Sequence, residues 1–138
     1  MKYLPKKHPS KIALDKIRKK YGLEIILLHG SQVSGKQHAK SDVDVAVLPK
    51  KGVKINTLDL IYDLSNVFAT DRVDIVNIAH ANPLLLQAVM SKSILISGDK
   101  SLYQALKLKA FNLYNDYLPY LEIERKSVLK NLEKYVTA

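Results

Sequence analysis

The stretch LLHGSQVSGKQHAKSDVDVAVL, residues 27–48, decides which of two phosphate-binding folds the chain can adopt. Within it, Gly30, Gly35 and Lys36 have the spacing of a P-loop, which requires a Ser or Thr after the lysine and a helix directly behind it. Gln37 stands at the Ser/Thr position, and the next residues run through a polar segment into an apolar strand pattern. The sequence therefore argues against a P-loop and leaves a Gly-Ser turn followed by an Asp-x-Asp pair.

The Asp-x-Asp pair consists of Asp42 and Asp44, at the start of an apolar run. Residues two apart on a strand project to the same face, so the pattern places two carboxylates side by side. Such carboxylates repel each other unless a cation lies between them, and Mg²⁺ binds one or two carboxylates together with substrate phosphate oxygens. At the end of the preceding run, Gly30 lets the backbone approach a phosphate closely and Ser31 can donate a hydrogen bond to it.

Helix and strand patterns alternate on both sides of this stretch. We expect helices at 10–21, 56–69, 83–90 and 99–138, and strands at 23–30, 43–48, 72–78 and 93–97. Ser10 and Gly22 are start and stop signals for the first helix, and Pro119 predicts a kink or a break in the last. The order predicts one α/β (α+β) domain, 1–138, with a catalytic sheet core at 1–98 and a C-terminal helical segment at 99–138.

A third carboxylate, Asp74, lies within the apolar run RVDIVNI, residues 72–78, where packing does not explain a charge. If this strand neighbours the one at 43–48, Asp74 joins Asp42 and Asp44 around two metal ions. Two metals a few ångströms apart suit in-line displacement at phosphorus, because one activates the attacking oxygen and the other holds the leaving pyrophosphate.

The composition fits either an acidic partner or a lysine-rich solvated surface, and it excludes several classes of protein. The 22 basic and 13 acidic residues give a net charge of +9, and 19 of the basic residues are lysine. A nucleotide, a nucleic acid or an acidic protein face fits that balance. No apolar run reaches transmembrane length, no secretory signal is visible, and the lack of cysteine excludes a disulfide framework and a thiolate zinc site. We expect a cytoplasmic protein with no membrane partner.

Together these motifs resemble the signature of the DNA polymerase beta nucleotidyltransferase superfamily: Gly-Ser, a loop of this length, Asp-x-Asp, and a third acid on a later strand. Within that superfamily the chain is similar to the minimal nucleotidyltransferases that are paired with HEPN proteins. The resemblance extends over nearly the whole chain, including RVDIVNIAHANPLLLQAVMSKSILISGD at 72–99. It implies the nucleotidyltransferase fold, a small mixed β-sheet flanked by helices, with a helical C-terminal extension.

The resemblance also implies an activity, the magnesium-dependent transfer of a nucleotide from a triphosphate, usually ATP, to a hydroxyl. By position, Gly30 and Ser31 would hold the triphosphate, Asp42 and Asp44 would bind Mg²⁺, and Asp74 would share one of two metals and help to deprotonate the acceptor. In the HEPN-paired family the acceptor is a tyrosine of the partner ribonuclease toxin, whose AMPylation silences it, so this chain would be an antitoxin. Family members often carry an arginine shortly after Gly-Ser, whereas this chain has SQVSGK at 31–36.

Three alternatives stay open at this point. They are nucleotidyl transfer to a small molecule, a non-catalytic module that neutralises its partner sterically, and direct nucleic-acid binding through the lysines. His29, which precedes the Gly-Ser turn, is interpreted as a hydrogen-bonded histidine at a strand end, with contact to a phosphate as the alternative. The aromatic and aliphatic residues of 99–138 fit packing across the sheet or a protein interface in the first half of the segment, and beyond Pro119 they favour a protein interface or a partner helix.

Overall fold

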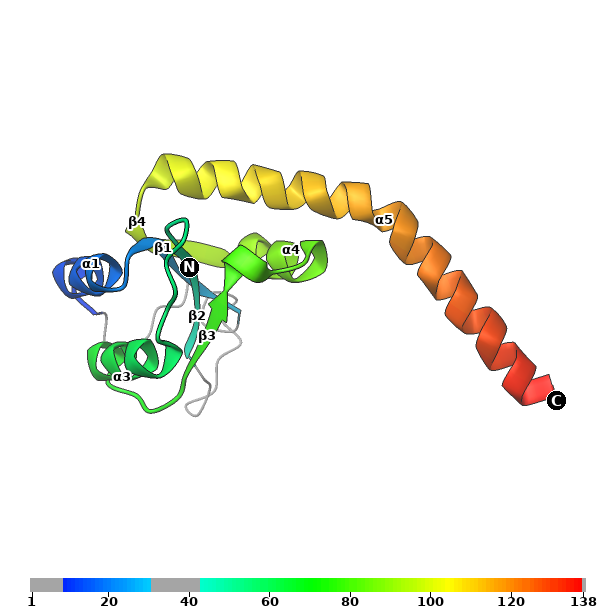
Figure 1. The fold of residues 1–138 in the computed structure, drawn as a ribbon, viewed down its shortest axis with the longest axis horizontal. Helices are drawn as coiled ribbons and strands as arrows, with labels where there is room; N and C mark the ends of the chain where they lie inside the picture. The colour runs from blue at the N-terminus through cyan, green and yellow to red at the C-terminus, as the bar shows by residue number, and fades with distance from the viewer. Residues whose placement is uncertain (1–8, 31–42, 138) are drawn as a thin grey trace.

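The computed structural model describes residues 9–30 and 43–137. Its elements follow one another in the order expected from the sequence, with one additional 3-10 turn, η1, between the third strand and the helix after it (Figure 1). The elements are α1 (Lys11–Lys20), β1 (Leu23–His29), β2 (Val43–Pro49), α3 (Thr57–Phe68), β3 (Val73–Asn77), η1 (Ile78–His80), α4 (Pro83–Ser91), β4 (Ser93–Gly98) and α5 (Lys100–Thr137).

The four strands form one mixed sheet in the order β3-β2-β1-β4. β1 is antiparallel to both β2 and β4, whereas β2 and β3 are parallel. A parallel pair requires a crossover connection, and α3 supplies it by returning the chain from the end of β2 to the start of β3. The fold class predicted from the sequence, a small mixed sheet flanked by helices with a helical C-terminal extension, is confirmed.

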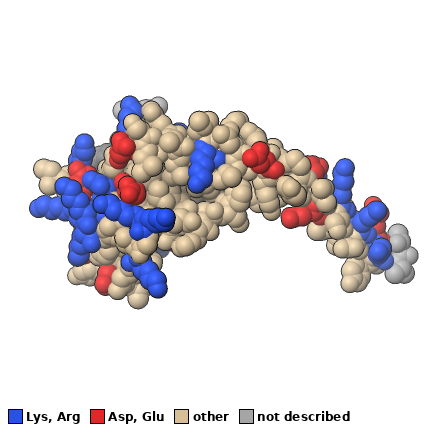
Figure 2. Space-filling view, turned by 45° about the horizontal axis from the view of Figure 1, so that its top comes forward, with Lys and Arg blue, Asp and Glu red and all other residues tan. Residues whose placement is uncertain are grey.

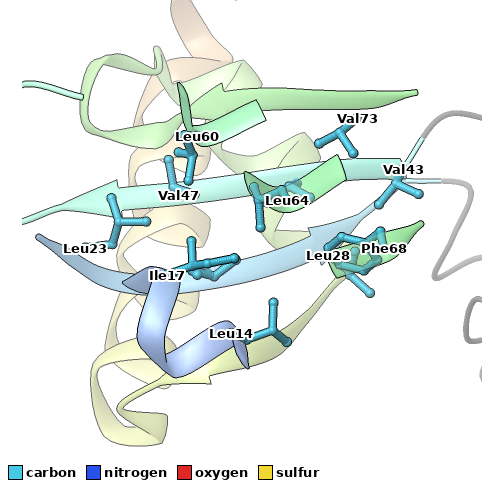
Figure 3. Packing of buried hydrophobic residues seen from close by; sticks show 12 residues of the cluster. Leu14, Ile17, Leu23, Leu28, Val43, Val47, Leu60, Leu64, Phe68 and Val73 are labelled. Carbon is cyan, nitrogen blue, oxygen red and sulfur yellow. The ribbon is translucent and has the colours of Figure 1, made fainter. Parts of the chain in front are cut away.

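Helices cover both faces of the sheet, which explains the nearly continuous burial of β1 and β2. On one face, buried side chains of α1 and α3 pack on alternate residues of the strands, as Figure 3 shows for Leu14, Ile17, Leu60 and Leu64. On the other face, α4 and the first turns of α5 cover Ile25, Leu27 and Ala46. Each strand therefore sends successive side chains into two separate cores.

Side-chain caps fix where three of the helices begin. The Ser10 hydroxyl accepts a hydrogen bond from the backbone N–H of Ala13, and the Asn56 side chain accepts one from Asp59. Asn82 caps α4 in the same way, with Pro83 at the first helical position. These caps satisfy backbone donors that have no partner within the helix.

α5 runs through Pro119 without ending, so the proline kinks the helix rather than breaking it. Figure 1 shows the axis of α5 changing direction in the orange part, the colour of residues near 120, after which the helix extends away from the sheet. Proline lacks the N–H and clashes with the carbonyl four residues earlier, which is the usual cause of such a bend. The part before the bend packs on α4 and β4.

Basic side chains are unevenly distributed over the surface. Figure 2 shows Lys and Arg gathered at the end of the molecule opposite the tip of α5, where Figure 1 places α1 and α3. Arg18, Lys19 and Lys20 form the last turn of α1, and Lys20 pairs with Asp63 of α3 at 2.8 Å. Direct nucleic-acid binding at this end stays a prediction. Among the described helices, none is long and apolar enough to cross a membrane.

Candidate nucleotidyl-transfer site

Four polar residues form one row across the sheet. The register pairs Asp74 of β3 with Asp44 of β2, Asp44 with His29 of β1, and His29 with Ser93 of β4. Residues paired in register project to the same face, so Asp74, Asp44, His29 and Ser93 lie side by side; we call them the polar row. Their neighbours two positions along each strand belong to the core beneath α4 and α5, which places the polar row on that face.

The two described carboxylates, Asp44 and Asp74, are neighbours because β2 and β3 are parallel and in register. Val43 N–H donates to the carbonyl of Arg72 at 2.7 Å, which fixes the start of this pairing. Of the other three residues expected at the site, Gly30 is described, whereas Ser31 and Asp42 lie outside the described residues. The metal and phosphate roles of all five residues remain predictions from the sequence.

Gly30 joins the polar row to the turn that follows β1. Its φ is +72°, a backbone conformation that favours glycine, and a Cβ at this position would lie 2.7 Å from Oδ2 of Asp44. The backbone N–H of Gly30 donates to the carbonyl of Lys92 at 3.3 Å, which ties the turn to the junction of α4 and β4. Any other residue would force the Asp44 carboxylate to shift, so the glycine leaves space beside the acid.

His29 lies between Asp44 and Ser93, and its environment differs from the interpretation drawn from the sequence. Its Nε2 is buried and has no hydrogen-bond partner among the described residues, so the expected strand-end hydrogen bond is absent at that atom. Burial lowers the pKa of His29 below its usual range, although the Asp44 and Asp74 carboxylates act in the opposite direction. An unpaired buried polar group costs about 1–3 kcal/mol.

Ser93 and Tyr103 complete the site on the α5 side, and sequence reasoning missed both. The Ser93 hydroxyl donates to the Met90 carbonyl at 2.8 Å and lies 2.8 Å from the Tyr103 hydroxyl oxygen. Tyr103 also donates to the Ser93 carbonyl at 2.9 Å. Because a serine at the start of a strand has no distinctive pattern, only the register reveals that it continues the polar row.

The donor set of the row fits a divalent cation. Adjacent carboxylates are hard oxygen ligands and need a cation to offset their repulsion, which is the chemistry of magnesium sites that also bind phosphate. Within residues 9–30 and 43–137, no group of three or more His, Cys, Asp or Glu side chains could hold a metal ion by itself. Asp44 and Asp74 thus supply part of a site whose third expected acid, Asp42, lies outside those ranges.

A separate cavity of about 430 Å³ lies along the β4 edge. Leu14, Leu28 and Phe68 line it, with Lys11 and Lys100 also contributing. These apolar residues belong to the core beneath α1 and α3, on the opposite face of the sheet from the polar row. The cavity is therefore not part of the acidic site.

Comparison with protein families decides the classification of the fold. The model of the family described as polymerase beta, nucleotidyltransferase matches residues 13–101, more than half of the chain. This chain belongs to the polymerase beta nucleotidyltransferase family. The matched range contains the whole polar row, and the resemblance drawn from Gly-Ser, Asp-x-Asp and the later acid is confirmed.

Known members of the family resemble the chain over most of its length. It is 28% identical over 111 residues to the protein adenylyltransferase MntA of Shewanella oneidensis, a match that covers 80% of this chain and 76% of that protein. A crystal structure of a toxin-antitoxin with AMP-PNP matches with a TM-score of 0.68 and 25% identity, covering 90% of this chain and 98% of that one. A structure of a tri-AMPylated Shewanella oneidensis HEPN toxin in complex with an MNT antitoxin shares the fold, with a TM-score of 0.61 and 22% identity over 89% of this chain and 95% of that chain.

Proposed function

We propose that this nucleotidyltransferase is a cytoplasmic antitoxin that moves AMP from ATP to a tyrosine hydroxyl of a partner HEPN toxin. The observation that carries the proposal is the pairing of Asp44 with Asp74 beside Gly30, inside the matched family range. The adenylyltransferase name of the Shewanella relative and the AMP-PNP and AMPylated-toxin structures support ATP as the substrate and a HEPN toxin as the acceptor.

In the proposed reaction, the acceptor oxygen forms a bond to the α-phosphorus as the bond from that phosphorus to the pyrophosphate oxygen breaks. Pyrophosphate leaves with the bonding electron pair, and the hydroxyl proton passes to a carboxylate of the site, for which Asp74 is our candidate. Asp42, Asp44 and Asp74 would hold two Mg²⁺ ions, which supply charge neutralisation at the triphosphate when bound. Gly30 and Ser31 would position the phosphates through backbone and hydroxyl donors.

Label transfer tests this reaction directly. The chain is incubated with Mg²⁺ and the HEPN-type product of the neighbouring gene, in parallel with ATP labelled at the α-phosphorus and ATP labelled at the γ-phosphorus. We expect the toxin to acquire the α label alone, in a form that requires Mg²⁺. Label from the γ-phosphate would indicate phosphoryl transfer instead. A stable complex that acquires neither label would favour steric neutralisation.

We propose further that α5 from its bend onward, residues 118–135, binds the toxin. Mainly apolar residues recur along it at alternating spacings of three and four positions. This is the spacing at which one helix packs against another. The exposed fractions are 57% for Val128, 53% for Leu132 and 85% for Tyr135. We call the positions of this repeat the heptad seam: Leu118, Leu121, Arg125, Val128, Leu132 and Tyr135.

A helix of the toxin is the partner that the heptad seam fits. A solved chain with this fold is found in a complex with a HEPN toxin, and heptad spacing is the spacing at which one helix packs along another. Arg125 lies at a central position, where parallel pairing of two copies would place like charges against each other. This arrangement favours a different chain, with an acidic or polar group opposite Arg125.

Replacing Leu132 with aspartate is expected to weaken toxin binding about thirtyfold, because burying an unpaired carboxylate in an interface removes about 2 kcal/mol or more. Ser127→Asp is the matched control, since it adds the same charge about one and a half turns away and off the heptad seam. It is expected to change the affinity less than threefold. Isothermal titration with the toxin measures both. Equal affinities for the two variants would exclude the heptad seam as the toxin surface.

A further inference from the structure

We propose that His29 is a positioning residue for the acidic site, in which its Nε2–H donates a hydrogen bond to the Asp44 carboxylate when metal and nucleotide are bound. This inference rests on the proposed function, because it assigns a role to a neighbour of the expected metal ligands. It arises from the polar row, where His29 is the only described residue paired in register with both an acid and the Ser93–Tyr103 pair.

The imidazole of His29 lies beside Asp44 in the sheet. Cross-strand partners of an antiparallel pair have Cβ atoms about 5 Å apart, so the His29 ring and the Asp44 carboxylate are within reach of each other on the same face. The influence of Asp44 on the pKa of His29 exceeds that of Asp74, which agrees with Asp44 being the nearer acid. Oδ2 of Asp44 lies 2.7 Å from the position that a Cβ at Gly30 would take, and no hydrogen bond joins Asp44 to Nε2 of His29 in the described structure.

Ser93, the other neighbour of His29 in the polar row, already has hydrogen-bond partners. Ser93 donates its hydroxyl hydrogen to Met90, and its oxygen contacts the Tyr103 hydroxyl. Tyr103 in turn donates to the Ser93 carbonyl. Ser93 is 8% exposed and held by these contacts, so it does not need to turn toward His29. The acid on the opposite side is therefore the acceptor that suits Nε2.

The imidazole ring suits this role chemically. A neutral imidazole carries one N–H, which it can donate to a carboxylate without adding charge to the site. Carboxylates that bind metals are commonly held by a hydrogen bond from a neighbouring group, which fixes the orientation of their oxygens. A buried polar atom with no partner in the described structure is the signature expected if that hydrogen bond forms only in the loaded site.

Two substitutions separate this role from simple packing. His29→Phe keeps an aromatic ring but removes the N–H, whereas His29→Gln shortens the side chain and keeps an amide donor. His80→Phe, at an exposed histidine of η1, is the matched control. Binding of Mn²⁺ in the presence of AMP-PNP is measured by the loss of the free-ion electron paramagnetic resonance signal, and the melting temperature is recorded for each protein.

We expect His29→Phe to weaken Mn²⁺ binding about tenfold, with a melting temperature equal to or above that of the unmodified chain. His29→Gln is expected to remain within about threefold of the unmodified chain, and His80→Phe to match it. Mn²⁺ affinity within twofold for His29→Phe, or equal weakening by Phe and Gln, would overturn the positioning role. An unmodified chain that binds AMP-PNP but no Mn²⁺ would overturn the proposed metal-dependent function and the His29 role together.

Discussion

Replacing Asp44 with asparagine is expected to lower the rate of nucleotidyl transfer about 100-fold to 1,000-fold while the fold is retained. Asparagine has the shape of aspartate, but it removes one of the charges that face Asp74 in the polar row. Groups that stabilise charge at a reacting phosphate typically contribute factors of this size. The melting temperature should stay the same or rise slightly, because the substitution relieves repulsion between the two carboxylates.

Initial rates of label transfer at saturating ATP, measured over a range of Mg²⁺ concentrations, test this expectation. A half-saturating Mg²⁺ concentration that rises with the substitution would identify Asp44 as a metal ligand. Asp71→Asn is the control, because Asp71 is exposed, lies three residues before Asp74 and undergoes the same change of charge. A rate for Asp44→Asn within tenfold of the unmodified chain would contradict the assignment of this carboxylate to the reaction.

Of the substitutions proposed for this chain, Gly98→Ala is expected to lower the free energy of unfolding most, by about 3 kcal/mol. This corresponds to a decrease of roughly 10 °C in melting temperature. Gly98 ends β4 with φ +123°, opposite Ile25 of β1. An added Cβ would lie 2.5 Å from the Glu24 carbonyl oxygen and 2.9 Å from the Cα of Ile25. These are backbone atoms of the central strand, and Ile25 is fully buried, so they cannot move aside without disturbing the sheet.

Gly52→Ala provides the comparison for Gly98→Ala. Gly52 also has a positive φ, +80°, but a Cβ there would meet no atom within 4 Å. Its substitution should therefore cost only the backbone strain, about 1 kcal/mol. Urea denaturation of the two variants isolates the effect of the clash. Equal free energies of unfolding for both would show that the β1–β4 contact is less tight than the geometry requires.

The helices and strands were predictable because local signals agree with the packing. Ser10 and Asn56 cap helices in the structure as their residue types suggest, and β1 is buried as its continuous apolar run predicts. The neighbouring positions of Asp44 and Asp74 follow from a helical pattern between two strand patterns, which favours a parallel crossover. The sequence could therefore anticipate that two of the expected acids come together.

The remaining features of the site depend on register, which a single sequence does not specify. The pairing of His29 with Ser93 depends on an irregularity between Ile26 and Leu27 in the β1–β4 ladder. A slip of one residue would send Ser93 to the other face of the sheet. The unpaired Nε2 of His29 depends on several side chains at once, so no local pattern could reveal it. η1 was missed because three residues are too few for a periodic signal.

The bend at Pro119 sets the direction in which the second half of α5 extends from the sheet. The helix beyond it is about 27 Å long at 1.5 Å per residue, so a change of about 10° in the bend would carry its tip through about 5 Å. That displacement exceeds the length of a hydrogen bond and is comparable to one helical turn. For a partner bound along this part of α5, the bend at Pro119 would set its distance from Asp44 and Asp74. The bend angle would therefore decide which hydroxyl group of the partner reaches the nucleotide phosphate.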